Sequence, residues 1–415
     1  MLTDDENEVF ESISAGKLIC LDNYRSETDK ALDKIRNGDV RINCLDKSGM
    51  NYLDQAAFKG NEKLAEELIK MGADADNRKH SHGYTSLMFA ALAGKPHLCE
   101  MLLNAGARSY ALNNMNKNAS EMAAFVGHFE CASLINSYIG YEDVNVLVHP
   151  KGEQSETIYP KEFVEYIHKL TRTHLIHPVS ITKGLLNESS ALEHRKKLIF
   201  IVDRLFEKQL RCKQPNEILS LKMWIILTSL REISNFIESK SKQQEESPDL
   251  PSILKQLIKQ TTDWKNVDGK IYRQKLETFL TSVVFGFPYK HSIVYTALAR
   301  SMKNLDFGRA PNTFTLICST LFGQRYAQAA FCSYCGQANA SKCCSNCKVV
   351  YCSADCQKSD WSSHKKVCEK LKADPTLNAY LVPGPDDSMT SLTLSDKDEN
   401  ADASLVEKES QEQTE

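Results

Sequence analysis

Eight metal-ligating side chains are concentrated in the 37 residues from Cys332 to Cys368. Their order is Cys332-x2-Cys335-x8-Cys344-x2-Cys347-x4-Cys352-x3-Cys356-x7-His364-x3-Cys368. A Cys-x2-Cys turn presents two sulfur atoms to one metal, and zinc prefers four thiolate or imidazole ligands in structural sites. His364 and Cys368 stand four residues apart, which favours one face of a helix beginning near Asp360. The spacing predicts two closed, four-ligand zinc sites that leave no position for a catalytic water.

Spacing alone permits two ways of dividing these ligands, either sequentially along the chain or interleaved. Cys343 adds a further alternative, because a Cys343-x3-Cys347 pair could replace Cys344-x2-Cys347. The shorter knuckle is the better zinc-binding turn, so we leave Cys343 out of the predicted set. A module this small has almost no apolar core of its own, so zinc binding should supply its folding energy.

The same spacing resembles the MYND finger family, in which the two zinc sites are interleaved. The resemblance implies one zinc held by Cys332, Cys335, Cys352 and Cys356, and a second held by Cys344, Cys347, His364 and Cys368. In that family the residues at the places of Gln357 and Trp361 line a shallow groove for short proline-rich peptides. Such peptides are already extended and lose little entropy on binding. The alternative is that Trp361 only covers the zinc site, and the two roles are compatible.

Glycines recur through the first third of the chain with a nearly constant period. Gly38, Gly72, Gly106 and Gly140 are each 34 residues apart, and a second series runs through Gly60, Gly94 and Gly127. Glycine suits a left-handed helix end and a tight turn between helices. The period is close to the value of about 33 that is typical of ankyrin repeats.

The sequence around these glycines resembles the ankyrin repeat family. The run from Gly83 to Ala91, Gly-Tyr-Thr-Ser-Leu-Met-Phe-Ala-Ala, begins one unit, and Leu-Leu-Asn-Ala-Gly-Ala at 102–107 closes it. Neighbouring units keep the paired alanines and the turn glycine. We predict a degenerate N-terminal cap with a helix over Thr28 to Val40, because end units face water and are atypical.

The predicted architecture is mainly α, with five regions in order along the chain. Ankyrin repeats occupy 1–141, with units at about 45–74, 79–108 and 113–140, followed by a linker at 142–159, an all-α segment at 160–330, the zinc finger at 332–368 and an acidic tail at 373–415. Helices are expected over 160–171, 189–210, 216–239, 250–260, 270–284 and 291–302 from their apolar periodicity. The tail is poor in large apolar residues, so we expect it to be disordered.

Net charge, the first ten residues and the absence of catalytic motifs indicate the class of protein. A formal net charge of -3 gives no global reason to expect nucleic acid or an anionic membrane as the main partner. The first ten residues are acidic and lack the basic and apolar regions of a secretory signal, so we expect a cytoplasmic protein. No catalytic motif for a phosphate loop, a nucleophile elbow or a zinc protease is present.

Two functional alternatives stay open besides protein binding. Some lysine methyltransferases carry an inserted MYND finger, but their β-rich catalytic halves and Asn-His-Ser-Cys stretch have no counterpart here. A nucleic-acid-binding transcriptional co-regulator would use the lysines that make the finger basic, which are Lys342, Lys348, Lys358, Lys365 and Lys366. Elements that read DNA bases are not recognisable, so this alternative ranks third.

The order of parts resembles the family of proteins that join ankyrin repeats to a C-terminal MYND finger. The resemblance implies a non-enzymatic adaptor that holds one protein on its ankyrin loops, near Asp46–Tyr52, His80–Ser86 and Met115–Ser120, and a proline-rich peptide on its finger. It also implies a role in delivering signalling proteins to the cilium, with an FKBP-type prolyl isomerase among the partners. A purely structural finger without a ligand is the competing hypothesis.

Overall fold

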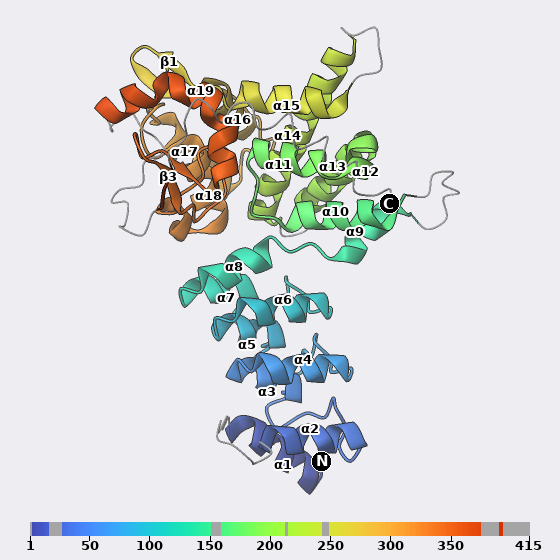
Figure 1. Ribbon diagram of the computed structural model, residues 1–415. Helices are drawn as coiled ribbons and strands as arrows, with labels where there is room; N and C mark the ends of the chain where they lie inside the picture. Colours follow the sequence, from blue (N-terminus) through green and yellow to red (C-terminus); the bar gives the residue numbers. More distant parts are fainter. Residues whose placement is uncertain are drawn as a thin grey trace, which may run out of the picture. The chain divides into compact units, whose positions relative to one another are not determined.

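The computed structural model describes residues 2–15, 27–150, 159–211, 215–242, 249–374 and 390–392. The chain divides into two compact units, Met1–Gly140 and Tyr141–Glu415. Both are mainly helical, as predicted, and Figure 1 shows the helices of the first unit stacked in pairs in chain order. None of the described helices is both long and apolar enough to cross a membrane.

The described residues of the first unit form four successive helix pairs. They are α1 (Asp4–Ala15) with α2 (Glu27–Asn37), α3 (Tyr52–Lys59) with α4 (Glu62–Lys70), α5 (Ser86–Leu92) with α6 (Pro96–Asn104), and α7 (Ala119–Phe125) with α8 (Phe129–Asn136). Helices α3 and α7 begin at capping boxes, in which Asn51 and Asn118 accept a backbone hydrogen bond three residues on. Buried alanines such as Ala56 and Ala90 let neighbouring helices approach closely within one continuous core.

The turn glycines behave as their period predicts. Gly60, Gly94 and Gly127 all have positive φ angles, between 66° and 87°. A Cβ atom on Gly94 would lie 2.6 Å from the ring of His128 in the next repeat. Both the backbone conformation and the close approach between repeats therefore require glycine at this position.

The second unit contains a helical segment followed by the cysteine-rich finger. Its helices are α9 (Tyr141–Val148), α10 (Lys161–Arg172), α11 (Pro178–Leu186), α12 (Ser189–Glu193), α13 (Arg195–Arg211), α14 (Glu217–Ser241), α15 (Leu250–Thr261), α16 (Gln274–Phe285), α17 (Ile293–Lys303) and α18 (Thr313–Phe322), with a short 3-10 turn at Gln324–Ala327. The long helix α14 packs against α11, α13, α15, α16, α17 and α18, so it forms the centre of the segment.

Several features of this unit differ from the sequence prediction, among them a break at His194 that divides the helix expected over 189–210 into α12 and α13. The predicted linker at 142–159 begins with helix α9, because Val144 and Val148 are buried against α10 and α13. Its residues 151–158 lie outside the described residues. Helices α11 and α18 were not predicted; α11 starts with Pro178 at its first turn, and His177 caps it by accepting the Val179 N–H.

A β-hairpin interrupts the segment that was predicted to be all-α. Residues 270–272 were assigned to a helix, but they form β2 (Lys270–Tyr272), antiparallel to β1 (Lys265–Val267). The turn between the strands is Asp268-Gly269, and both residues have positive φ angles. An Asp-Gly pair with this conformation is a strong hairpin signal. The helix expected over 270–284 therefore starts only at Gln274.

The acidic tail contributes one strand. Residues 375–389 and 393–415 of the predicted disordered region lie outside the described residues. Within it, β5 (Thr390–Leu392) pairs in parallel with β3 (Lys342–Cys344), which differs from the prediction. A sheet edge offers free peptide N–H and C=O groups, so a segment needs no apolar side chains to pair there.

Lys222 on α14 carries a buried amine that lacks a partner. Its side chain is fully buried, and its Nζ has no hydrogen-bond partner among the described residues. Burial, aided by the charge of Arg172, lowers the pKa of Lys222 from 10.5 to about 7. Between these two pKa values the unfolded chain binds a proton that the folded chain lacks. The free energy of unfolding should therefore rise with pH from about pH 7 to about pH 10.

Replacing Lys222 with methionine is expected to stabilise the second unit by about 3 kcal/mol at neutral pH, because an apolar side chain of similar length removes the burial penalty. The same change should abolish the rise of stability with pH. Urea unfolding followed by tryptophan fluorescence measures both effects, since Trp224, Trp264 and Trp361 are the three tryptophans of the chain and all lie in this unit. Lys259→Met, at an exposed position on α15, is the matched control. An unchanged unfolding midpoint for Lys222→Met would contradict the prediction.

Candidate metal centres

The finger brings its ligands together with two knuckles, a short hairpin and one helix. The first knuckle closes through a hydrogen bond from the Gly336 N–H to the Cys332 carbonyl, at 2.9 Å. The second knuckle lies between β3 and β4 (Val350–Tyr351), which pair as antiparallel strands. Helix α19 (Ala354–Ala373) begins at Ser353, whose hydroxyl accepts the Cys356 N–H. This helix supplies Cys356, His364 about two turns later and Cys368 one turn after that.

Two groups of four ligand atoms form, each within 4.8 Å of one another. They are the predicted groups, Cys332, Cys335, Cys352 and Cys356 in one, and Cys344, Cys347, His364 and Cys368 in the other. Cys343 belongs to neither group and is buried on β3. All eight ligands are buried except Cys352, which is half-buried.

The distances within each group fit tetrahedral zinc. In the first group the sulfur atoms of Cys335, Cys352 and Cys356 lie 3.5 to 3.8 Å apart. In the second, the Cys344 and Cys368 sulfurs are 3.8 Å apart and the Cys347 sulfur is 3.4 Å from His364 Nε2. Zinc–sulfur bonds of about 2.3 Å in a tetrahedron require sulfur–sulfur edges of about 3.8 Å. The finger therefore holds two structural zinc ions, and each ion has a complete set of protein ligands.

Residues outside the ligand sets contact both zinc sites. Lys183 of α11 places its Nζ 3.6 Å from the Cys356 sulfur and 4.7 Å from the centre of the Tyr334 ring. Four thiolates and one Zn²⁺ carry a net charge of -2, so this ammonium offsets charge at the first site. At the second site, the His364 imidazole lies among the rings of Trp264, Tyr351 and Trp361, with centroids about 6 Å away.

A buried ion pair joins the finger to the helical segment. Arg273, which precedes α16, makes two hydrogen bonds to Asp360 of α19, at 2.7 and 3.1 Å, and both side chains are completely buried. Asp360 also accepts hydrogen bonds from the Tyr351 hydroxyl and from Trp264 Nε1. The Arg273 guanidinium stacks on the Trp264 ring at 4.4 Å. Every member of this group has a partner, which is what a buried pair of charges requires.

Helix α11 makes a second junction with the finger, at the first knuckle. The hydroxyl of Ser180 donates to the Cys335 carbonyl at 2.6 Å. His177 is buried so closely against Gly336 that a Cβ atom on that glycine would lie 2.6 Å from it. Burial lowers the pKa of His177 to about 3, so its imidazole is neutral and accepts the Val179 N–H.

One hydrophobic cluster spans both junctions. It contains Val179, Ile258, Trp264 and Ile271 of the helical segment together with the zinc-binding cysteines and the finger residues Val349, Val350 and Leu371. The finger thus shares a core with the helices, which differs from the expectation of a module with almost no apolar core. Sequence analysis did not identify Lys183, Arg273, Asp360 or Trp264 as part of the site, because their contacts join positions about 90 to 170 residues apart.

The two residues predicted to bind a peptide occupy different environments. Trp361 is partly exposed on α19, while its indole Nε1 is buried and lacks a hydrogen-bond partner among the described residues. Gln357 is only 1% exposed, so a peptide could reach it only if neighbouring atoms moved. Trp361 is therefore the accessible member of the predicted pair.

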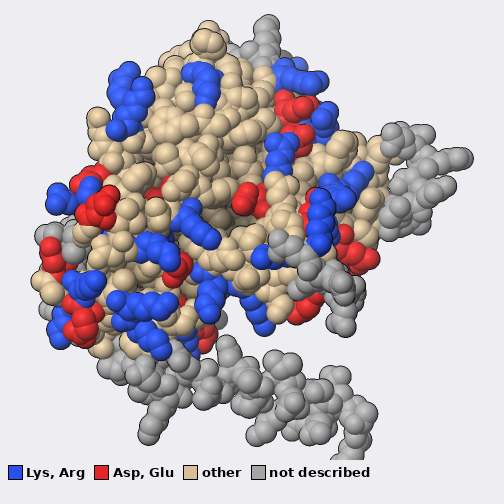
Figure 2. All heavy atoms as spheres, turned by 90° about the horizontal axis from the view of Figure 1, so that it is seen from above, with Lys and Arg blue, Asp and Glu red and all other residues tan. Residues whose placement is uncertain are grey.

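The basic residues of the finger do not form a patch of one sign. Lys358, Lys365 and Lys366 are exposed on α19, but Asp355 and Glu369 are exposed on the same helix. Over the face drawn in Figure 2, lysine and arginine side chains are scattered among acidic ones. This arrangement differs from the continuous basic stripe that is typical of nucleic-acid-binding proteins.

The ankyrin repeats present a second candidate surface on their first helices. Phe58, Leu92 and Phe125 each stand two residues before a turn glycine, so they occupy equivalent positions in three adjacent repeats. Phe58 is 56% and Phe125 91% exposed, and Leu92 is partly exposed. We call these three residues the inner-helix stripe.

Aromatic rings extend this stripe toward the predicted ankyrin loops. The Phe58 ring contacts Phe89 edge-on at 5.7 Å, and Tyr84 stacks on Phe89 at 5.5 Å. Met115, in the last of the predicted loops, is 63% exposed. Phe89 itself is buried, so the exposed apolar groups here are Phe58, Phe125 and Met115. Exposed apolar side chains of this size are typical of a protein-binding surface when they lie close together.

Comparison with known proteins identifies two families of module in the chain. The model for ankyrin repeats (3 copies) matches residues 53–146, and the model for the MYND finger matches residues 332–368. The first match covers the helix pairs from α3 to α8 and extends into α9, leaving α1 and α2 outside it, and the second coincides with the zinc-binding region.

Among individual relatives, Dauer abnormal formation protein 25 of Caenorhabditis elegans is 41% identical over 352 residues, which cover 84% of this chain and 89% of the relative. Tudor domain-containing protein 1 of Oryzias latipes is 33% identical over 109 residues, or 9% of its length. The E3 ubiquitin-protein ligase Ufd4 of Drosophila melanogaster is 31% identical over 121 residues, or 4% of its length. The first similarity extends over nearly the whole chain, and the other two cover only parts of it.

Proposed function

The chain belongs to the family of proteins that join ankyrin repeats to a C-terminal MYND finger, together with Dauer abnormal formation protein 25, and on that premise we propose that it is a non-enzymatic adaptor. It binds one protein on the inner-helix stripe of its ankyrin repeats and a proline-rich peptide beside Trp361. The exposed stripe of Phe58, Leu92 and Phe125 is the observation that carries the proposal. Much of the surface of these three apolar side chains, which occupy equivalent positions in three repeats, faces solvent in the isolated chain and would be buried by a partner.

The zinc centres support the non-enzymatic part of the proposal. Each group supplies four protein ligands, so neither metal retains the open position that a catalytic zinc uses to activate water. The finger instead holds Trp361 at the surface, fixed by its contact with the ligand His364. An aromatic side chain fixed in this way suits an extended proline-rich peptide.

Two surfaces on one chain can act together. If one partner engages both, the second contact forms within the complex, and tethering raises its effective concentration to the millimolar range. Weak individual sites then suffice for stable capture. The family resemblance adds three further parts to the proposal. They are a cytoplasmic location, delivery of signalling proteins to the cilium, and an FKBP-type prolyl isomerase as a partner.

The proposal predicts that the two surfaces retain different proteins. Phe125→Ser should remove one set of partners from an affinity capture quantified by mass spectrometry, and Trp361→Ala should remove another. Both losses are expected to exceed about tenfold, since a buried aromatic anchor contributes about 2 kcal/mol or more. Phe200→Ser is the matched control, because Phe200 is an equally hydrophobic side chain, 49% exposed on α13, outside both surfaces.

Zinc content separates recognition from folding in this experiment. Trp361→Ala should keep two zinc ions per chain, as measured by native mass spectrometry. Capture profiles of Phe125→Ser and Trp361→Ala that match the Phe200→Ser profile would contradict the adaptor proposal. Loss of captured proteins together with zinc would instead assign Trp361 to the support of the finger.

A further inference from the structure

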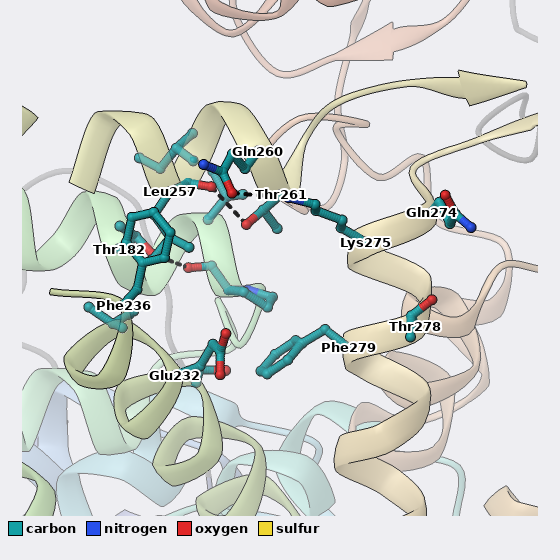
Figure 3. A pocket seen from close by; sticks show the side chains of 15 residues that line it. Thr182, Glu232, Phe236, Leu257, Gln260, Thr261, Gln274, Lys275, Thr278 and Phe279 are labelled. Carbon is teal, nitrogen blue, oxygen red and sulfur yellow. Dashed lines mark hydrogen bonds between the residues drawn. The ribbon is translucent and has the colours of Figure 1, made fainter. Parts of the chain in front are cut away.

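The helical segment contains a pocket that neither proposed surface uses. It has a volume of about 410 Å³, within the range of about 300 to 1,000 Å³ that is typical of ligand sites. Helices α14, α15 and α16 form its walls, and α11 contributes Val179 and Thr182. Figure 3 shows Glu232 and Phe279 projecting toward each other from α14 and α16 across the pocket.

The interior of this pocket is chemically apolar. Its buried hydroxyl groups donate within their own helices, Thr182 to the Pro178 carbonyl and Ser229 to the Ile225 carbonyl, each at 2.8 Å. Thr261 likewise donates to the Leu257 carbonyl. Because these donors are already used, the groups present mainly methyl and methylene surface to an occupant, beside the rings of Phe236 and Phe279.

Two charged residues line the pocket, and they differ in their contacts. Lys275 donates to Gln260 at 3.0 Å, which links α16 to α15. Glu232 is exposed and has neither an ion-pair nor a hydrogen-bond partner among the described residues. A carboxylate facing the Phe279 ring at the edge of an apolar pocket attracts a cation, since both groups favour positive charge.

The pocket is supported by the finger. Val179 and Ile258 line the pocket and also belong to the hydrophobic cluster that contains the zinc-binding cysteines. The part of the pocket formed by α11 and α15 is therefore held in place by the same packing that attaches these helices to the finger. A preformed pocket costs little to bind, because the side chains that line it are already ordered.

We propose that this pocket is a third protein-binding site, which takes a large apolar side chain of a partner flanked by a lysine or arginine that pairs with Glu232. We take the occupant to be a segment of polypeptide, because the exposed rim residues Glu232, Gln274, Lys275 and Thr278 can contact its backbone and polar side chains while its anchor fills the pocket. This site extends beyond the adaptor proposal and does not depend on the inner-helix stripe or on Trp361.

Two labelled synthetic peptides test the site on the full-length chain by fluorescence anisotropy. Both carry the same leucines and phenylalanines at helical spacing, and their polar positions are all lysine in one and all glutamate in the other. The lysine peptide is expected to saturate with a Kd on the order of 10 µM, and the glutamate peptide should bind at least about tenfold more weakly.

Variants assign the binding to the pocket. Thr278→Trp fills it from the exposed rim and should weaken the lysine peptide at least about tenfold, which corresponds to about 1.4 kcal/mol. Lys255→Trp places the same side chain at an exposed position of α15 outside the pocket and should have no effect. Glu232→Gln should reduce the ratio of the affinities for the lysine and glutamate peptides. If Thr278→Trp fails to fold, this variant alone tests whether the peptide binds at the pocket.

Three results would overturn the proposal: no saturable binding of the lysine peptide, equal affinity of the wild type and Thr278→Trp, or an unchanged charge preference in Glu232→Gln. Because neither Phe125 nor Trp361 is altered, these results leave the adaptor proposal untouched. Conversely, the pocket can bind the peptide whether or not those two residues act in capture.

Discussion

Removing zinc with a chelator is expected to unfold the finger and to loosen the part of the helical segment that packs on it. Structural zinc contributes about 10 to 16 kcal/mol in isolated zinc-finger peptides at neutral pH, which exceeds the stability of most domains. The zinc-binding cysteines lie in one hydrophobic cluster with Val179, Ile258 and Trp264. Losing the metal therefore removes the support of α11 and of the β1–β2 hairpin as well.

Hydrogen exchange measures the extent of this effect. After chelation, amides at 177–183 and 264–273 should exchange rapidly together with those of the finger. Amides of the ankyrin core, such as those at 87–91, provide an internal control, because that core contains no zinc ligand. Retained protection at 264–273 after complete loss of zinc would show that the hairpin does not depend on the folded finger, against the shared core.

Single cysteine variants test the ligand assignment within the same measurement. Cys352→Ser should lower the zinc content of the first site, and Cys344→Ser that of the second. Each variant should therefore bind fewer than two zinc ions per chain. Cys343→Ser is a closely matched control, because this buried thiol is adjacent to Cys344 and belongs to neither group. Loss of zinc from Cys343→Ser would instead support the alternative knuckle.

The features that could be predicted from the sequence are those with a fixed local spacing. The zinc ligands recur at x2 and x3 spacings, and glycines recur at 34-residue intervals. Each spacing reflects one repeated local geometry, so the positions of these residues alone predict the structure. The Asp268-Gly269 turn is equally local, and it should have been recognised as a hairpin signal before residues 270–272 were assigned to a helix.

The junction between the finger and the helices could not be predicted in the same way. Arg273 and Asp360 are 87 residues apart, and nothing in the residues around either one indicates the other. Helix α11 is short and only partly amphipathic, so its sequence shows little helical periodicity. Its packing on the finger is a tertiary contact that local periodicity cannot indicate. Burial of Gln357 is likewise a property of the folded unit, because an isolated helix would expose it.

Replacing Arg273 with methionine is expected to destabilise the second unit by about 3 to 5 kcal/mol, because it leaves the Asp360 carboxylate buried without its cation. Asp360→Asn keeps an acceptor for Tyr351 and Trp264 but leaves the buried guanidinium without an anion, so it should also be strongly destabilising. The double variant removes both charges, and its loss of stability should be smaller than the sum of the two single losses.

Urea unfolding followed by tryptophan fluorescence is the appropriate measurement, since it reports on the second unit alone. Lys265→Met provides the control in the same hairpin: Lys265 pairs with Asp263 at 2.7 Å, but the lysine is 52% exposed, so its loss should cost less than about 1 kcal/mol. If the finger and helices form one cooperative unit, Arg273→Met shifts a single transition to lower urea. A second transition for the finger, with the helices unchanged, would mean that the ion pair only attaches a separately folded module. In that case the pocket beneath α11 and α15 would not depend on zinc.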